Sequence, residues 1–338
     1  MNKKCIIWST TIIVFLLSFF CAIYFGAEKV PLKALFGMGS KFNNIILFDL
    51  RLPRALLAII TGILLGGSGA VFQLFFRNPL AEPGIMGISS GATLGAVIAT
   101  MAGSLFPIFT NISNPFLDKL FSIISPINFA AFLGALGSGL LVTFFAFSKA
   151  GRRSTIMLLL CGTALGTLYS SLSSIIILTT DKEFHSIYTW ILGSFNGRGW
   201  DELVFILLPS LISIFIMFSL SGSLDLLSSG ETAAQSLGLE VQKVRVLVLV
   251  SGSLAVSAAV CAGGTIGFVG LIAPHIVRSV IGPKGKKLIP FSMIFGAILL
   301  LVSDTLARVI IRPAELPTGL ITSILGVPFF ISLCLREK

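Results

Sequence analysis

The sequence is poor in charged residues and has almost no histidine. Only 11% of its 338 residues are Asp, Glu, Lys or Arg, whereas 55% are hydrophobic and the mean hydropathy is +1.00. A soluble protein of this length could not bury so much apolar surface, because most of its residues would have to lie in the core. Two histidines occur, and no H-E-x-x-H or C-x-x-C motif is present, so the sequence indicates no metal centre of those types.

The cysteines and the catalytic motifs exclude further classes. The five cysteines (5, 21, 161, 261 and 334) stand singly in apolar runs, which favours small buried hydrophobes over disulfides or metal ligands. No nucleophile, base and oxyanion donor recur at a usable spacing. The string nearest to a phosphate-binding loop, GPKGKK at 282–287, lacks the hydroxyl residue and the preceding strand. We therefore expect no catalytic residue and no metal or cofactor on this chain. Any ATP and Mg²⁺ must be bound by another chain.

Long apolar runs are what the sequence does contain, and they do not alternate as the strands of a β-barrel would. Each run of about 20 residues matches ~30 Å of hydrocarbon, which predicts an all-α polytopic membrane protein with residues 1–338 in one domain embedded in a lipid bilayer. The eighth run contains Pro274 and is short, so we expect a broken or half-depth helix. The first reads as an uncleaved anchor. The ten expected spans are 6–25, 54–76, 84–105, 127–147, 155–179, 201–220, 244–262, 268–281, 288–311 and 317–335.

The basic residues predict the orientation. With ten spans, both termini lie on the same side, and the short loops at 148–153 and 281–287 give that side a small excess of Lys and Arg. The positive-inside rule then places both termini in the cytoplasm. The formal charge of +10 does not indicate nucleic-acid binding, because the basic residues sit at the ends of spans and not on one continuous face.

Residues 222–242 form a polar island between two apolar spans. Ser228 and Glu231 have the S-x-x-E spacing of a capping box, which predicts a short helix there, and Gly238 offers a left-handed stop. Ala233, Ala234 and Leu237 would then form a small, close-approach face. Two interpretations remain open: a short helix lying on the membrane surface, or a helix that docks into a groove on a partner.

Four arginines stand at predicted outer span ends, where the topology rule disfavours them. Arg51 and Arg54 precede the second span, and Arg308 and Arg312 end the ninth. They could anchor helix ends by snorkelling, or present a cationic ring to an acidic partner. Asp304 lies four residues before Arg308, so the two can pair on one helix face. An acid within a span is a candidate proton relay, and the pairing favours a structural or gating bridge instead.

The second span and the turn after it carry further polar residues. Gln73 could line a polar path or bond to a neighbouring helix. The turn RNPLAEPG at 77–84 has two prolines four residues apart, so it should be stiff and non-helical at the inner face. Asn78 can bond to the local backbone there.

Several blocks together resemble one family. They resemble the permease subunits of the FecCD group, the membrane component of bacterial ABC importers for ferric siderophores, haem and cobalamin, and the match is collinear from about residue 50 to the C-terminus. The blocks are RLPRALLAIITG (51–62), SGAVFQLFFRNPLAEPGIMGISSGA (68–92), WILGSF (190–195), GETAAQSLGLEVQKVR (230–245), GFVGLIAPHIVR (267–278), SDTLAR (303–308) and AELPTGLITSILGVPFF (314–330).

The resemblance implies a fold like that of the cobalamin-importer permease and a set of partners. These are two cytoplasmic ABC ATPase subunits, an extracytoplasmic substrate-binding protein, and a second permease copy around a central path. We expect a homodimer in the bacterial cytoplasmic (inner) membrane, with an iron chelate or cobalamin as cargo. The alternative is a proton-coupled secondary transporter that uses Asp304.

The resemblance also implies roles for single residues. The island contains the coupling helix, although Thr232 replaces the second acid of the family pattern GEE-x-A-x-x-LG. Binding-protein docking falls to the outer arginines, which we expect to tolerate Arg51→Glu and Arg54→Glu without unfolding. The implied coupling residues are Ser228, Gly230, Glu231, Ala233, Ala234, Leu237 and Gly238; the docking residues are Arg51, Arg54, Arg308 and Arg312; the cytoplasmic gate residues are Asn78, Leu80 and Thr155.

Overall fold

The structure is a computed structural model that describes residues 3–28, 30–31, 33, 39–105, 124–148, 155–179 and 184–336. Within these ranges every regular element is a helix, which confirms the predicted fold class. Among the described residues, seven helices are long and apolar enough to cross a membrane, and three shorter apolar helices, which begin at Ile88, Val269 and Thr318, accompany them. Together they correspond to the ten predicted spans.

The helix bounds follow the predicted ones to within a few residues, with two exceptions. The helical run of the second span begins at Lys41 and not near residue 54. Helix α10 was expected to end near 220 but continues to Leu227, so the first part of the polar island is an extension of a span. The long helices are α1 (Lys3–Tyr24), α3 (Leu52–Phe76), α4 (Ile88–Leu105), α6 (Pro126–Ala146), α8 (Thr155–Leu178), α10 (Trp200–Leu227), α12 (Val241–Gly263), α14 (Gly285–Val309) and α15 (Thr318–Arg336). The short elements are α2 (Lys41–Asn44), η2 (Ile45–Arg51), η3 (Pro83–Met86), α9 (Phe184–Ile191), α11 (Glu231–Ser236) and α13 (Val269–Ile281).

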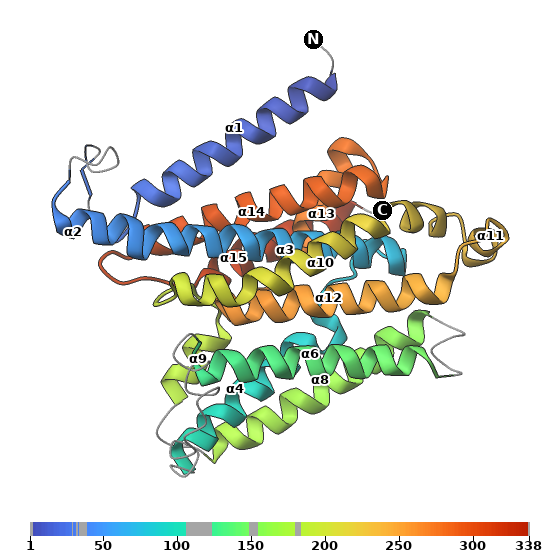
Figure 1. Cartoon of the computed structure of the whole chain (residues 1–338), viewed down its shortest axis with the longest axis horizontal. Helices are drawn as coiled ribbons and strands as arrows, with labels where there is room; N and C mark the ends of the chain where they lie inside the picture. The colour runs from blue at the N-terminus through green and yellow to red at the C-terminus, as the bar shows by residue number, and fades with distance from the viewer. Residues whose placement is uncertain are drawn as a thin grey trace.

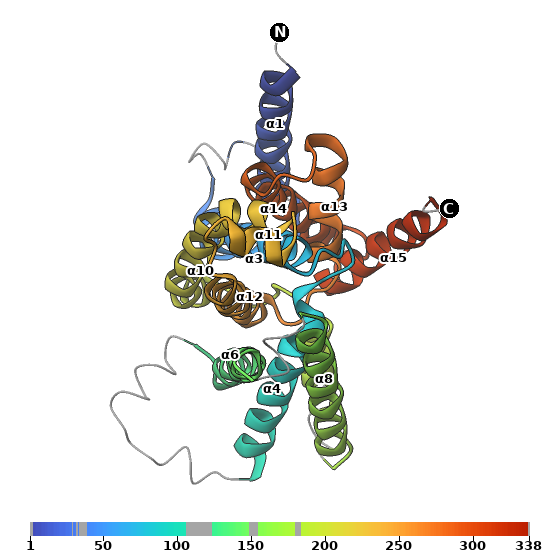
Figure 2. The same ribbon diagram turned by 90° about the vertical axis from the view of Figure 1, so that its right-hand side faces the viewer.

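The helices form two groups that lie along the long axis of the molecule (Figure 1). Helices α3, α10, α12 and α14 form the central group, with α13 and α15 beside it and α1 above it. Helices α4, α6 and α8 form the second group, which contacts the first mainly where α6 packs against α12 (Figure 2). The short helix α11 lies at one end of the molecule and α2 at the other, and both termini lie in the half that carries α11.

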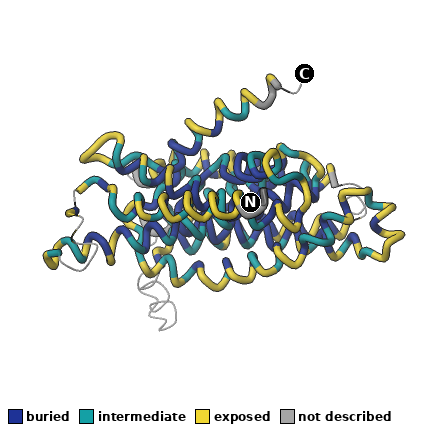
Figure 3. The backbone as a smooth tube through the Cα atoms, turned by 90° about the horizontal axis from the view of Figure 1, so that it is seen from above, coloured by how far each residue is buried: buried dark blue, intermediate teal, exposed yellow. Residues whose placement is uncertain are grey.

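Small residues bring the central helices together. Helix α3 packs most extensively against α14, and Gly62 faces Gly296 across this contact. A Cβ atom added at either glycine would overlap the backbone of the other helix, so only glycine allows this approach. Figure 3 shows the consequence: residues in the middle of the bundle are buried, whereas the outer helices carry exposed residues along much of their length, many of them large and hydrophobic. A lipid-facing protein is expected to expose apolar residues in this way, because hydrocarbon and not water surrounds them.

Helix α13 is short, as predicted from the proline in its sequence. It has 13 residues and contains Pro274, and its first residue Val269 is buried. Gln73 on α3 donates to the carbonyls of Gly270 and Leu271 at 3.4 and 3.3 Å, and it accepts from Arg278 at 3.1 Å. Of the two interpretations of Gln73, the structure therefore supports the bond to a neighbouring helix.

Candidate functional site

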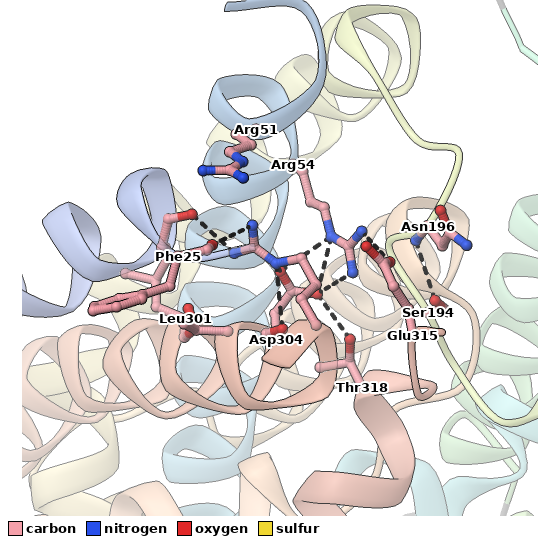
Figure 4. A network of polar contacts seen from close by, with 12 residues as sticks. Phe25, Arg51, Arg54, Ser194, Asn196, Leu301, Asp304, Glu315 and Thr318 are labelled. Atoms are coloured by element: carbon pink, nitrogen blue, oxygen red, sulfur yellow. Dashed lines mark hydrogen bonds and ion pairs between the residues drawn. The ribbon is translucent and has the colours of Figure 1, made fainter. Parts of the chain in front are cut away.

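The first candidate site is the arginine cluster, which consists of Arg51, Arg54 and Arg308 and lies at the N-terminal end of α3. Arg54 forms two ion pairs, one with Asp304 at 2.9 Å and one with Glu315 at 2.7 Å. Arg308 pairs with Asp304 at 3.1 Å, which confirms the predicted contact between residues four apart on α14. The Thr318 hydroxyl donates to the same carboxylate at 3.0 Å. Figure 4 shows this network of residues, to which α3, α14 and the start of α15 all contribute.

These arginines do not form an exposed cationic ring, so that expectation was wrong. Arg51, Arg54 and Arg308 are only 5%, 7% and 2% exposed. Arg51 donates to the carbonyls of Ile23 and Tyr24 at 3.0 and 2.6 Å and to that of Glu28. The physical reason is that acceptors of this chain hold the guanidinium groups: carbonyls at and just after the end of α1, and the carboxylates of Asp304 and Glu315.

The arginine cluster borders a cavity of about 720 Å³. Acidic side chains line it as well as basic ones, so the mouth of the cavity carries mixed charge and not positive charge alone. Burial lowers the pKa of Arg198, which lies between α9 and α10, and the nearby Glu202 carboxylate opposes this shift. The charged residues that line the cavity are Glu28, Asp49, Arg51, Arg54, Arg198, Asp201, Glu202, Arg308 and Glu315.

Arg312 differs from the other three. It is exposed and follows the end of α14, so among the proposed docking residues it alone presents its side chain outward. The contacts of Arg54 also argue against the expectation that Arg54→Glu leaves the fold intact. A glutamate there would bring a third acid beside Asp304 and Glu315 in a buried site.

The second candidate site is the coupling segment, which contains α11 at the opposite end of the molecule (Figure 1). The predicted capping box is absent. Ser228 instead ends α10 and donates to the carbonyl of Asp225, and Gly230 occupies the position before α11. The reason is that α10 runs further than its apolar pattern indicated, so Ser228 falls at its last turn.

The C-terminal end of α11 is formed as predicted. Gly238 adopts a left-handed φ of +83°. Its N–H donates to the carbonyl of Gln235 at 2.9 Å, and the N–H of Leu239 donates to that of Ala234 at 3.0 Å. These two bonds satisfy carbonyls at the end of the helix, and glycine allows the turn because it has no Cβ.

The face of α11 that was expected to meet a partner is divided. Ala234 is fully buried against the rest of the chain, whereas Ala233 and Leu237 are exposed, Leu237 by 67%. Ala234 therefore faces inward and cannot contact a partner in this structure. The exposed part of the segment is the part available for docking.

Glu231 points toward the protein and pairs with Arg245 of α12. The two charged groups are 3.3 Å apart, and Arg245 is 1% exposed. Arg245 also donates to Gln242, whose amide donates to the carbonyl of Ala146 at the end of α6. The role of Arg245 was not predicted from the sequence. Its one signal was a charged residue within the apolar run of α12, and no periodic spacing links it to Glu231.

The third candidate site is the turn after α3. The N–H of Leu80 donates to the Asn78 side chain at 2.9 Å, which confirms the predicted bond of Asn78 to the local backbone. Leu80 is 40% exposed, and the chain remains non-helical until η3 begins at Pro83. Thr155 begins α8 as expected, but its side chain lies outside the described residues.

The structure does not bring the three sites together. The arginine cluster and α11 lie toward opposite ends of the long axis, and the turn lies on a separate connection from either. Within the described part of the chain, no three His, Cys, Asp or Glu residues lie close enough to hold a metal ion. The geometry therefore offers three separate candidate sites.

Comparisons with known proteins identify the family. The model of the FecCD transport family matches residues 11–336. The iron(3+)-hydroxamate import system permease FhuG of Bacillus subtilis is 34% identical over 100% of this chain and 98% of its own length. The molybdate import system permease MolB of Haemophilus influenzae is 38% identical over 87% of this chain and 82% of its own.

A solved structure gives the same result for the fold. It is an inward-facing ABC transporter assigned provisionally to the metal-chelate type, and it is 32% identical with a TM-score of 0.83. The match covers 98% of this chain and 99% of that one. The resemblance first seen in short sequence blocks thus extends over nearly the whole length and the whole helix arrangement. This chain is a polytopic membrane protein of the permease type and belongs to the FecCD transport family.

Proposed function

We propose that this chain is the membrane-spanning subunit of an ATP-driven importer that carries a ferric siderophore, haem or cobalamin into the cytoplasm. Family membership supports the ABC permease role. The observation that carries the proposal further is α11: a short helix with exposed Ala233 and Leu237 outside, and with Ala234 and the Glu231–Arg245 ion pair inside. A transporter that works alone has no need for an exposed helix fixed so firmly to a span.

The proposed complex contains two ABC ATPase subunits, an extracytoplasmic binding protein and a second copy of this chain. ATP and Mg²⁺ are held by the ATPases, and this chain binds no cofactor. Both termini and α11 lie on the cytoplasmic side of the bacterial inner membrane, and the arginine cluster lies near its outer side. The location of α11 and of the cluster at opposite ends of the molecule is consistent with this orientation.

Transport then requires conformational change and no covalent chemistry on this chain. The loaded binding protein docks near the exposed Arg312, and complementary charge mainly sets the encounter rate and the register. ATP binding moves the ATPases, and α11 passes this movement to α12 through Glu231 and Arg245. The path alternates between two packing states, with Asn78 and Leu80 at its cytoplasmic gate and Thr155 as a second gate position.

Proton-coupled transport through Asp304 is the alternative, and its geometry is unfavourable. A proton carrier must meet the transport path, but Asp304 is 1% exposed. Its carboxylate is already engaged by Arg54, Arg308 and Thr318. These contacts favour a structural role for Asp304.

Uptake in vesicles separates the two mechanisms. The purified permease and its ATPase are reconstituted with ATP inside, and the binding protein is added outside. We expect uptake to persist when a protonophore collapses the proton gradient and to stop when ATP is omitted. Loss of uptake with ATP still present would contradict the ATP-driven mechanism.

The cargo needs a separate experiment, because relatives of similar identity are named for different cargoes. The matching binding protein is purified and offered a ferric hydroxamate, haem, cobalamin and molybdate in separate samples. Native mass spectrometry then measures which of them it retains. We expect an iron chelate or cobalamin, and retention of molybdate alone would contradict the proposed cargo class.

A further inference from the structure

The connection between α3 and α4 re-enters the bundle. Helix α3 ends at Phe76, yet Glu82 and Pro83 line a cavity of about 380 Å³ together with Leu65, which lies in the middle of α3. At a rise of 1.5 Å per residue, Leu65 is about 16 Å back from Phe76 along the helix. The connection therefore runs back along α3, and Glu82 lies near the midpoint of this helix.

At this depth the Glu82 carboxylate meets the first turn of α13. The N–H of Phe268 donates to Oε1 of Glu82 at 3.1 Å. The first amides of a helix lack partners within it, and the partial positive charge there favours an anion. The bond thus satisfies a group that the helix itself cannot satisfy.

Phe268 has an unusual backbone conformation. Its φ is +68°, in the left-handed region that residues with a side chain rarely adopt. Such a conformation persists only when its surroundings hold it. Glu82 supplies one such restraint on the N–H side of this residue.

The ring of Phe268 contacts α15. A Cβ atom added at Gly326 would lie 2.5 Å from Cγ of Phe268, so the ring packs directly on the backbone of α15. On the other side, Gln73 of α3 holds the carbonyls of Gly270 and Leu271. The first turn of α13 is therefore held between α3, the re-entrant segment and α15.

We propose that Glu82 is a positioning residue for transport, which links the Asn78–Leu80 turn to Phe268 and, through its ring, to α15. Only three residues lie between Asn78 and Glu82, and Pro79 and Pro83 limit how far the segment can stretch. A movement of the turn must then displace the first turn of α13 and the contact at Gly326. This inference rests on the proposed function, because it assigns the turn to the cytoplasmic gate.

Hydrogen–deuterium exchange of the whole importer complex in nanodiscs tests the link. Without nucleotide, we expect Glu82→Ala to speed exchange in the first turn of α13 by about tenfold, the effect of losing one hydrogen bond to a charged group. Glu82→Gln keeps an acceptor oxygen and should restore exchange close to the wild-type rate. Equal exchange in Glu82→Ala and wild type would overturn the proposal.

A second variant disturbs the link while leaving Glu82 in place. Gly326→Ala forces the Phe268 ring away from α15, and we expect it also to speed exchange in the first turn of α13. Gly137→Ala on α6 is the matched control, because a Cβ there meets no atom within 4 Å. If Glu82→Ala does not fold, Gly326→Ala tests the proposal in its place. Exchange in the first turn of α13 equal to that of Gly137→Ala would then overturn the proposal.

Adding ATP and vanadate to the wild-type complex tests the coupled movement. We expect changes in exchange at the 78–80 turn, in the first turn of α13 and around Gly326 together, with the last two reduced in Glu82→Ala. If the turn responds while α13 and α15 do not, the role of Glu82 is wrong and the proposed function survives. If the complex binds no ATP and nothing responds, the proposed function itself fails.

Discussion

Replacing Arg54 should separate a role in folding from a role in docking. In the structure Arg54 holds Asp304 at 2.9 Å and Glu315 at 2.7 Å, and its side chain is 8% exposed. Removing one partner of a buried ion pair costs about 3–5 kcal/mol, because the other charge stays buried without compensation. Arg308 and Thr318 still reach Asp304, so we expect Arg54→Ala to fall at the lower end, ~3 kcal/mol.

Arg312→Ala is the matched comparison, because this arginine is exposed and lies in the same region. Surface substitutions usually change stability by less than about 0.5 kcal/mol. We expect Arg312→Ala to melt with the wild type and to weaken binding-protein docking, most clearly at low salt. Arg54→Glu should be less stable than Arg54→Ala, because it adds a third acid to the site.

A thiol-reactive dye measures the thermal unfolding of each variant in detergent. Cys261 is buried in α12, so its reaction with the dye rises when the bundle opens. A loss of ~3 kcal/mol corresponds to a melting temperature lower by roughly 4 °C, at about 1.4 °C per kcal/mol for a chain of 338 residues. If Arg54→Ala melted within 2 °C of the wild type, or if Arg312→Ala lost as much stability, the argument from burial would be refuted.

The remaining predictions concern α11 and the central helix contact. Ala234→Leu should overpack the interior by about 1–3 kcal/mol and lower cargo uptake per ATP hydrolysed, as measured in proteoliposomes; unchanged coupling would contradict the inward orientation of Ala234. Arg245→Ala should release Glu231 and speed hydrogen exchange across α11, and exchange like that of the wild type would show that the ion pair does not hold this helix. Gly296→Ala should lower the melting temperature because its Cβ overlaps the backbone of α3. Gly137→Ala should not, and equal melting of these two glycine variants would contradict the close α3–α14 contact.

The sequence determined the class of the protein and most helix boundaries. Hydrocarbon admits only segments that satisfy their own backbone, so runs of apolar residues predict spans directly. Two boundaries were clearly wrong: the start of the second span, where the helical run already begins at Lys41, and the end of α10, where residues 222–227 continue the helix. Hydropathy measures the environment of side chains, and a helix can leave the apolar region without ending.

Several local signals were correct, although the Ser228–Glu231 capping box was not. The left-handed Gly238 and the Asn78 turn were correctly predicted because their bonds join residues only a few positions apart. The Asp304–Arg308 pair belongs to the same group, since one helix turn fixes its spacing.

Only the tertiary structure decided which way the charged residues point. Arg54 meets Glu315 across 261 positions, and Glu231 meets Arg245 on another helix. The same holds for Glu82, whose partner Phe268 is 186 residues away. No periodic pattern links such residues. Whether an arginine faces solvent or an acid of its own chain depends on the packing of helices that are distant in sequence.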